Sequence, residues 1–258
     1  MSLAGQVAIV TGGASGMGRI MALRLAEQGA QVAIFDMNDA GLVTTAHENS
    51  AIHPFKCDVS DWPQVQERVA EVTEKLGPVD RLIHAAALMP GHALVDDSVE
   101  SVTRLMNINF NGTLHMIKAV LDDMLARDSG TLILFGSVAG EAMVPKMGAY
   151  CTSKAAVNVY VETLHYELAH TGLKIHLICP PAVNTPLVDQ TMSTDTPGSI
   201  IEAKKAGRLA DPIKIVDAID KGVAKGKAVI FPGEARLLYL WHALFPRLWW
   251  KVVMKFEK

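Results

Sequence analysis

The chain has 258 residues, of which 50% are hydrophobic and 20% charged, and its net charge is −3. The apolar content excludes an intrinsically disordered chain, and the length corresponds to about one or two domains. A sequence pI of 6.3 lacks the basic excess of nucleic-acid-binding proteins, so we expect no nucleic-acid partner.

Short apolar runs alternate with amphipathic stretches up to about residue 231. The runs predict strands, and the middle ones are almost entirely apolar, as in a sheet covered on both faces. The predicted strands are 7–11, 31–35, 52–56, 81–85, 131–135, 174–179 and 228–231.

The predicted helices lie between these strands, at 16–29, 39–48, 62–76, 101–127, 150–170 and 212–225. Two of them begin at a capping aspartate, Asp61 or Asp211, with a proline in the first turn. Alternation of this kind predicts right-handed βαβ units, and so an α/β fold with one doubly wound parallel sheet and helices on both faces. The stretch 184–208 is rich in Thr, Ser, Asp, Pro and Gly, which predicts a long irregular loop over a substrate site.

A glycine-rich turn, Thr11-Gly-Gly-Ala-Ser-Gly-Met-Gly18, connects the first predicted strand to the first helix. Such glycines allow a sharp turn and a close approach of the backbone to a pyrophosphate, which would face the free N–H groups at the helix start. The sequence therefore predicts a Rossmann-type dinucleotide site. Its expected residues in this turn are Gly12, Ser15, Gly16, Met17 and Gly18.

Two acidic residues follow the next strands. Asp36 ends the second strand, 18 residues after Gly18, where a carboxylate accepts the adenosine ribose hydroxyls and repels a 2′-phosphate. We therefore expect NAD rather than NADP. Asp58, with Val59 behind it, follows the third strand and is a candidate for the adenine edge, although a helix-capping or turn role suits Asp58 almost equally well.

A phenol and an ammonium stand four residues apart at Tyr150 and Lys154, which places them on one helix face. A nearby cation stabilises phenolate and lowers a Tyr pKa from about 10, so the phenol becomes a general acid/base near neutral pH. Ser137 ends the fifth strand, at the same carboxyl edge of the sheet as the glycine turn.

The ordered motifs resemble the short-chain dehydrogenase/reductase family over about residues 5–231. They are the glycine turn at 11–18, Asp58-Val59, Asn109-x-x-Gly112, Ser137 and Tyr150-x-x-Ser-Lys154. The resemblance implies that Tyr150 exchanges a proton with the substrate oxygen and that Ser137 orients this oxygen. It implies that Lys154 depresses the Tyr150 pKa and holds the nicotinamide ribose, and that Asn109 anchors a water in a proton relay.

The resemblance also implies reversible hydride transfer between NAD and a secondary alcohol or ketone. Val183 and Thr185 match the segment that holds the nicotinamide carboxamide, and Ala85 is a further expected cofactor contact. The family further implies a homodimer or homotetramer, built partly by helices near 101–127 and 150–170. An alternative from another class is a non-catalytic NAD-binding regulator, which the complete set of Asn109, Ser137, Tyr150 and Lys154 argues against.

Two positions depart from the family pattern. His84-Ala-Ala-Ala87 stands where the family has Asn-Asn-Ala-Gly, so the amide that normally ties neighbouring strands is missing at Ala85. Pro180-Pro181 replaces Pro-Gly, which fixes φ at residue 181 and removes an N–H. We expect no metal site, because His165 and His170 are five residues apart and point to different helix faces.

The three cysteines, Cys57, Cys151 and Cys179, form no CxxC pair, which suits a reducing compartment. No basic segment precedes an N-terminal apolar run, and no stretch reaches the roughly 18 apolar residues of a membrane span. These observations together predict a cytoplasmic protein.

We expect residues 1–233 to form the catalytic and cofactor-binding domain and residues 234–258 a C-terminal extension. Seven of the 15 aromatic residues lie in the last 28 positions, and residues 234–258 carry a net charge of +3. Three interpretations of this extension stay open. It contacts a membrane surface, it folds over the active-site mouth or a subunit contact, or it packs into the core of its own chain. The first two favour a hydrophobic substrate.

Overall fold

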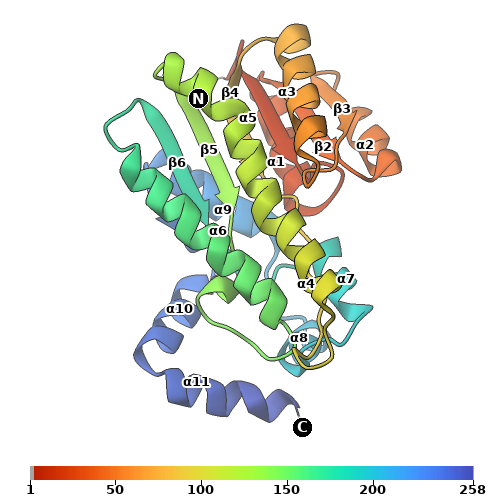
Figure 1. Cartoon of the computed structure of the whole chain (residues 1–258), viewed down its shortest axis with the longest axis vertical. Coiled ribbons are helices and arrows are strands. Elements are labelled where there is room, and N and C mark those ends of the chain that lie inside the picture. The colour runs from red at the N-terminus through yellow and green to blue at the C-terminus, as the bar shows by residue number, and fades with distance from the viewer. Residues whose placement is uncertain (1–2, 258) are drawn as a thin grey trace.

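The computed structural model describes residues 3–257, and its centre is a seven-stranded parallel sheet (Figure 1). The strand order is β3-β2-β1-β4-β5-β6-β7, which confirms the predicted doubly wound arrangement. Every predicted strand is present within two residues of its predicted ends. The strands are β1 Val7–Thr11, β2 Gln31–Asp36, β3 Ile52–Lys56, β4 Val79–His84, β5 Gly130–Phe135, β6 Leu173–Ile178 and β7 Val229–Ile230.

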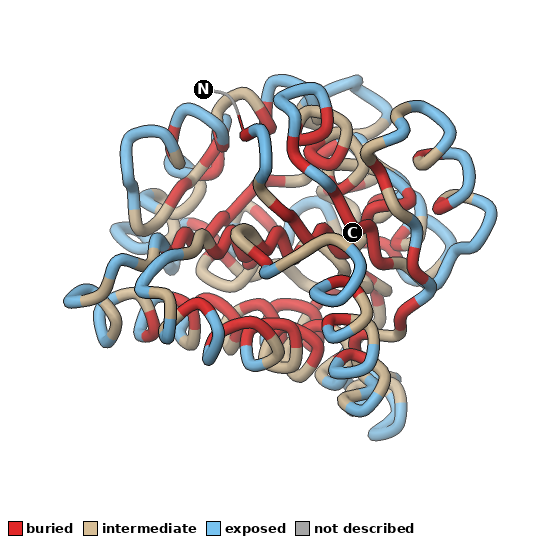
Figure 2. The backbone as a smooth tube through the Cα atoms, turned by 90° about the horizontal axis from the view of Figure 1, so that it is seen from above, coloured by how far each residue is buried: buried red, intermediate tan, exposed pale blue. Residues whose placement is uncertain are grey.

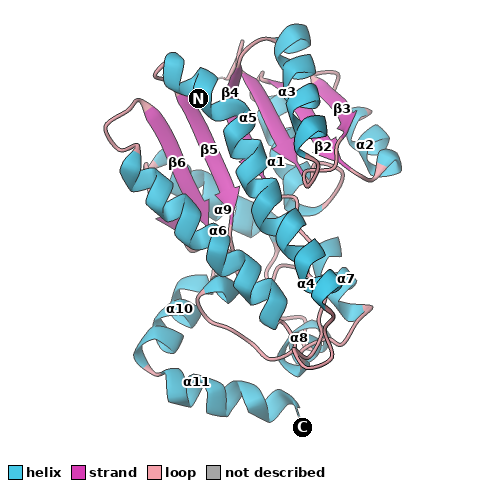
Figure 3. Ribbon diagram, in the orientation of Figure 1, coloured by secondary structure: helices cyan, strands magenta, loops and turns pink. Residues whose placement is uncertain are grey.

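Helices cover both faces of the sheet (Figure 3). One face carries α3 (Trp62–Leu76), α5 (Gly112–Ala126) and α6 (Gly148–Glu167), and the other carries α1 (Gly16–Glu27), α2 (Asp39–Ala46) and α9 (Pro212–Ala224). The two predicted helix starts are confirmed. The side chain of Asp61 accepts from the N–H of Gln64, and that of Asp211 accepts from the N–H of Ile213.

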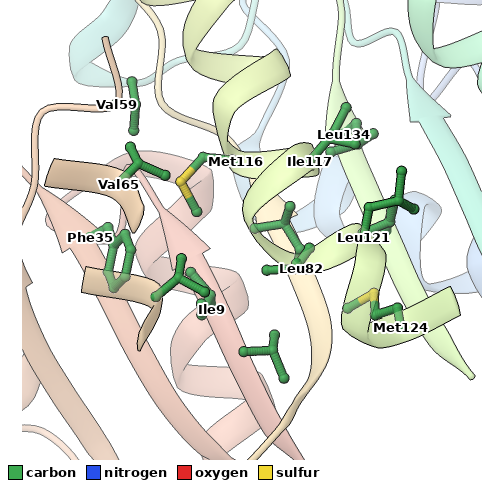
Figure 4. Close-up of a cluster of buried hydrophobic side chains, with 14 of the residues drawn as sticks. Ile9, Phe35, Val59, Val65, Leu82, Met116, Ile117, Leu121, Met124 and Leu134 are labelled. Carbon is green, nitrogen blue, oxygen red and sulfur yellow. The ribbon is translucent and has the colours of Figure 1, made fainter. Parts of the chain in front are cut away.

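The buried side chains form two large clusters, one on each side of the sheet. Figure 4 shows part of the first cluster, where Ile9, Phe35 and Leu82 of the strands meet Met116 and Leu121 of α5. In Figure 2 the buried residues follow the strands and the inner faces of the helices. A sheet buried on both faces explains why the strand sequences read as unbroken apolar runs.

The predicted single helix at 101–127 is wrong in one respect. The structure divides it into α4 (Val99–Met106), a π-helical turn (Asn107–Asn111) and α5. A π turn inserts an extra residue into the helix and changes the direction of the side chains on it. Here the inserted segment carries Asn109, which is fully buried.

The predicted irregular loop at 184–208 is also wrong in part, because it contains α7 (Pro186–Met192) and α8 (Gly198–Lys205). The Thr-, Ser- and Pro-rich composition reflects helix starts: Thr185 precedes α7, with Pro186 in its first turn, and Pro197 precedes α8. Both helices are short, so no long apolar period marks them in the sequence.

Two further helices, α10 (Ala235–Leu244) and α11 (Pro246–Val253), follow β7 and end in a 3₁₀ turn at Met254–Glu257. They lie beyond the carboxyl ends of the strands, on the same side as α8 (Figure 1). Within residues 3–257, no helix combines the length and the hydropathy that a membrane crossing requires.

Candidate active site

The glycine turn between β1 and α1 requires its glycines. Gly12 and Gly16 have φ angles of +68° and +53°, which other residues rarely adopt. A Cβ atom at Gly18 would lie 2.3 Å from the carbonyl oxygen of Gly12, so only glycine allows α1 to begin this close to the turn. The turn leaves its backbone open to a neighbouring cleft.

This cleft has a volume of about 450 Å³ and lies at the carboxyl edge of the sheet. Ten of the residues expected to contact the cofactor line it together: Gly12, Ser15, Gly16, Met17, Gly18, Asp36, Asp58, Val59, Ala85 and Thr185. The carboxylate of Asp36 accepts from the N–H groups of Ala14, at 3.2 Å, and Asn38, at 3.0 Å. These bonds fix Asp36 at the end of β2. A cradle of glycines with a carboxylate at its far end fits a dinucleotide.

Asp58 and Val59 belong to the lining of the cleft. The Asp58 carboxylate accepts from the N–H of Ser60, at 2.9 Å, and from its hydroxyl, at 2.7 Å, so Asp58 also makes a turn. A Cβ atom at Gly112 would lie 2.7 Å from Cγ2 of Val59, which explains the glycine three residues after Asn109.

Residue 85 is alanine and has no side-chain amide that could link neighbouring strands. Thr11, at the end of β1, instead makes a link to the residues that follow β4. Its hydroxyl oxygen accepts from the N–H groups of Ala85 and Ala86, both at 3.1 Å. Both lone pairs are then used, so the hydroxyl hydrogen donates to Nδ1 of His84, at 2.9 Å. His84 is buried and burial lowers its pKa to about 3, with the charge of Lys154 as a smaller cause. Thr11 therefore ties β1 to the segment after β4 although the amide is missing at residue 85.

Ser137, Tyr150 and Lys154 lie together at the carboxyl end of β5 and the first turns of α6. All three are buried, and the Ser137 side chain forms a hydrogen bond with the Tyr150 phenol. The ammonium of Lys154 donates to the carbonyl oxygen of Phe135, at 2.8 Å. Ser137 and Tyr150 thus lie in contact, and Lys154 lies one turn beyond Tyr150 on α6.

The pKa of Tyr150 differs from the expectation. Burial raises it, and the hydrogen bond with Ser137 opposes that rise only partly. Burial also lowers the pKa of Lys154 to about 8. The expected net lowering of the Tyr150 pKa is therefore wrong, because loss of hydration dominates at this site.

Asn158 is a positioning residue that the sequence analysis missed. It lies one turn beyond Lys154 on α6, and its amide donates to the carbonyl oxygen of Ser137, at 3.0 Å, while its Oδ1 accepts from the N–H of Ser137, at 3.3 Å. A Cβ atom at Gly136 would lie 1.9 Å from this oxygen. The available signal was the continued spacing of four residues through 150, 154 and 158.

Asn109 lies behind the cavity rather than in its lining. Its amide group donates to the carbonyl oxygen of Leu88, at 3.0 Å, and to the hydroxyl of Ser153, at 2.9 Å, and its Oδ1 accepts from the N–H of Leu88, at 2.8 Å. Both amide hydrogens are thus used within the protein. Asn109 connects α6 to the segment after β4, and its relay role stays a prediction.

Ser137, Tyr150 and Lys154 line an apolar cavity of about 310 Å³. This cavity shares Met17, Ala85 and Thr185 with the glycine-lined cleft, so the two spaces adjoin. Val183 and Pro181 belong to the cavity wall, and Val183 also pairs with Ala210 as an isolated bridge. The remaining wall is almost entirely hydrophobic.

The C-terminal helices supply part of this wall. The sequence alone left three interpretations of this extension open. Within residues 235–257, the side chains that line the cavity are those of Leu238, Trp241, Trp249, Val252, Val253 and Phe256. Trp249 and Val253 also pack with Val138 and Ala142. The extension therefore covers the active-site mouth of its own chain. Uneven aromatic content was the only signal for it.

Histidine and acidic residues offer no competing site in the described part of the chain, where no group of three or more His, Cys, Asp or Glu is placed to hold a metal ion. His165, considered above for a metal site, uses Nδ1 to donate to the carbonyl oxygen of Ile175, at 2.8 Å.

Comparison with known proteins agrees with this geometry. The family model described as short chain dehydrogenase matches residues 6–196. A 2-dehydro-3-deoxy-L-rhamnonate dehydrogenase (NAD(+)) from a Sphingomonas strain is 36% identical over 72% of this chain and 76% of its own. The 17-beta-hydroxysteroid dehydrogenase 13 of Rattus norvegicus is 26% identical over 99% of this chain and 84% of its own.

Solved structures show the same fold. A short chain dehydrogenase/reductase from Burkholderia phymatum in complex with NAD gives a TM-score of 0.84 at 24% identity, covering 94% of this chain and 95% of that one. An actinorhodin polyketide ketoreductase with NADPH gives 0.80 at 28% identity, covering 89% and 97%. The neighbours thus hold either nucleotide. With the motifs, the sheet order and the family match in agreement, this chain belongs to the short-chain dehydrogenase/reductase family of oxidoreductases.

Proposed function

We propose that this protein is an NAD(H)-dependent oxidoreductase that interconverts a hydrophobic secondary alcohol and its ketone. The observation that carries the proposal is the position of Ser137, Tyr150 and Lys154. They form the polar corner of an apolar cavity that adjoins a glycine-lined cleft. A bound nicotinamide would supply or accept the hydride.

Tyr150 is proposed to exchange the proton. In reduction, its phenol donates a proton to the substrate oxygen while that oxygen accepts a second hydrogen bond from Ser137. The raised pKa of Tyr150 supports this role, because it keeps the phenol protonated at neutral pH. In oxidation the same group must accept the proton, so that direction is favoured by higher pH.

Lys154 and Asn109 are proposed to support this step from behind. Lys154 lies on the same face of α6 as Tyr150, and its ammonium is proposed to hold the nicotinamide ribose. Asn109 is proposed to anchor the relay water of the family, together with Ser153, which connects it to the backbone of Tyr150. Val183 and Thr185 are proposed to hold the carboxamide.

NAD is proposed over NADP because the glycine-lined cleft contains the negative charge of Asp36. The carboxylate of Asp36 lies at the end of β2, where it suits free ribose hydroxyls and repels a phosphate. Met37 follows it, and the only cation among the described residues that line the cleft is Arg104, which comes from α4. Gly12, Ser15, Gly16, Met17, Gly18, Asp58, Val59 and Ala85 are proposed to complete the nucleotide contacts.

A panel of apolar secondary alcohols and ketones, assayed with NAD(H) and NADP(H), tests the proposal. Wild type should turn over at least one apolar substrate, whereas Tyr150→Phe should bind NADH with unchanged affinity and lose on the order of 10²- to 10⁴-fold in turnover. Binding of NAD without turnover of any substrate would instead favour a regulator.

We also propose a homodimer or homotetramer formed through α5 and α6. The outer surface of α6 exposes Val159 and Tyr166, seven residues apart and so on one helix face. Light scattering of the eluted protein should give a multiple of 27.8 kDa, and Val159→Glu should reduce that mass.

A further inference from the structure

The helices α10 and α11 have two different apolar sides. The inner side, with Trp241 and Trp249, lines the cavity. Leu237, Leu240, Leu244, Phe245, Leu248 and Trp250 lie outside the cavity lining and are exposed to solvent, and they are called the outer face below. Leu237 and Leu244 are the most exposed of these six residues, at 70% and 68%. They lie two turns apart on one face of α10. A patch of this kind marks an interaction site.

The charges on this segment have one sign. Residues 235–256 contain four basic residues and no acidic one, which leaves −7 on the rest of the chain. Within residues 3–257, none of Arg236, Arg247, Lys251 and Lys255 takes part in an ion pair. Arg247 and Lys251 are four residues apart, so they project from one face of α11.

Two acidic residues flank this segment: Glu234, which precedes α10, and Glu257, which follows the 3₁₀ turn and has its partners elsewhere. Glu257 accepts from the N–H of Gly198, at 2.7 Å, and pairs with Lys146, at 3.5 Å, on the side of α8. The outer face therefore combines exposed leucine, phenylalanine and tryptophan with unpaired cations, while the body of the molecule is acidic.

We propose that the outer face of α10 and α11 docks on an anionic lipid membrane. Its apolar side chains enter the boundary between headgroups and acyl chains, and Arg247 and Lys251 bind lipid phosphates. The acidic body is repelled by the same surface, which orients the protein with its C-terminal helices toward the lipid.

The position of the cavity extends this inference to the substrate. The docking helices are also the cavity wall, so an apolar alcohol or ketone dissolved in the bilayer reaches the cavity without passing through water. This extension rests on the proposed function. The docking itself does not.

Flotation with lipid vesicles tests the docking. Full-length protein should float with vesicles of phosphatidylcholine and phosphatidylglycerol, float less with phosphatidylcholine alone, and be released by salt. A double change of exposed residues, Leu244→Gln with Phe245→Gln, should abolish flotation. Arg247→Gln with Lys251→Gln should remove the preference for the anionic lipid.

Matched controls lie elsewhere on the surface. Val95→Gln with Val99→Gln removes exposed apolar residues. Lys221→Gln with Lys225→Gln removes two exposed cations four residues apart at the C-terminal end of α9. Both controls should float as wild type does. Absence of wild-type flotation, or equal flotation of all variants, overturns the proposal.

Two further readouts separate the remaining explanations. None of the substituted residues lines the cavity, so turnover of a water-soluble substrate should be unchanged in every variant. If the protein is active but does not float, the docking proposal is rejected and the proposed function stands. If it floats but turns over no substrate, the proposed function is rejected and the docking proposal stands. If Leu244→Gln with Phe245→Gln lowers the mass in solution and no form floats, the face is a contact between copies of this chain and docking on lipid is rejected.

Discussion

The indole N–H of Trp249 donates to the carbonyl oxygen of Met143, at 2.7 Å, and so fastens α11 to the segment that leads into α6. Trp249 is only 5% exposed, and its ring meets that of Trp241 edge to face, with centroids 5.3 Å apart. Because Trp249 also lines the cavity, one side chain both closes the site and attaches its cover.

We expect Trp249→Phe to destabilise the protein by about 1 kcal/mol, since the hydrogen bond to the Met143 carbonyl is lost while most of the packing remains. It should also raise the KM for apolar substrates. Urea unfolding and steady-state kinetics measure both. The matched control is Trp250→Phe, because Trp250 is exposed and lies outside the cavity lining. Equal effects of the two substitutions would contradict the role assigned to Trp249.

Much of this architecture could be predicted from the sequence, because its signals are local. Each strand of the covered sheet is an apolar run, and Gly12, Gly16 and Gly18 stand where only glycine fits. The residues at the ends of β1, β2, β4 and β5 meet because parallel strands bring their carboxyl ends to one edge. For this reason the sequence predicts Asp36 and Ser137 at one edge of the sheet, whereas Tyr150 and Lys154 are predicted on one helix face by their four-residue spacing.

The remaining features depend on contacts between distant residues, which no local pattern records. The π turn at Asn107–Asn111 lies within a stretch whose sequence reads as one continuous helix. The helices α7 and α8 are too short to show a helical period. The packing of Trp249 on Val138 and Ala142 joins residues more than a hundred positions apart. The Tyr150 pKa was missed for a similar reason: spacing shows which charge is near, but burial depends on the whole fold.

Asn158 should matter for the rate rather than for substrate binding. Replacement by leucine removes both hydrogen bonds to the Ser137 backbone, so Ser137 loses its fixed position while the cavity wall stays intact. We expect Asn158→Leu to lower kcat on the order of tenfold or more, with a smaller change in KM. Asn158→Asp keeps the acceptor for the Ser137 N–H and should recover part of the loss. A change confined to thermal stability, with kcat unaltered, would contradict this role.

The pH dependence of ketone reduction should reflect Lys154. Its pKa is about 8, so the side chain is an ammonium below that pH and loses its charge above it. The raised pKa of Tyr150 keeps the acid protonated over the same range. We expect kcat/KM for reduction to be flat below pH 8 and to fall above it with a limiting slope of about tenfold per pH unit.

Lys154→Arg provides the control for this profile, since a guanidinium stays charged throughout. The variant should be slower but should show no fall near pH 8. The same fall in the variant would assign the titration to another group.

His84 should make the protein acid-sensitive. Its folded-state pKa is about 3, below the ordinary value of 6.5, so the unfolded chain binds a proton that the folded protein does not. The stability that follows from this difference is complete above pH 6.5 and is lost as the pH falls toward 3. At pH 5 the loss amounts to about 2 kcal/mol.

His84→Asn removes this titration and keeps a polar side chain beside the Thr11 hydroxyl. Its unfolding free energy should therefore fall less than that of wild type between pH 7 and pH 5, by about 2 kcal/mol. His47→Asn, at an exposed site, should follow wild type. Parallel pH curves for wild type and His84→Asn would contradict the buried, neutral state of this imidazole.

The choice of nucleotide should depend on Asp36. Asp36→Asn keeps an acceptor for the N–H of Ala14 or Asn38 but removes the charge that opposes a 2′-phosphate. A hydrogen bond to a charged group contributes about 1.5–3 kcal/mol, so NAD affinity should fall by about 10- to 150-fold while NADP affinity rises. Fluorescence titration with each nucleotide measures the two dissociation constants. The control is Asp39→Asn, because Asp39 pairs with Lys56 at the surface and lies outside the lining of the glycine-lined cleft. An unchanged ratio of the two constants in Asp36→Asn would show that nucleotide choice is determined elsewhere in the cleft.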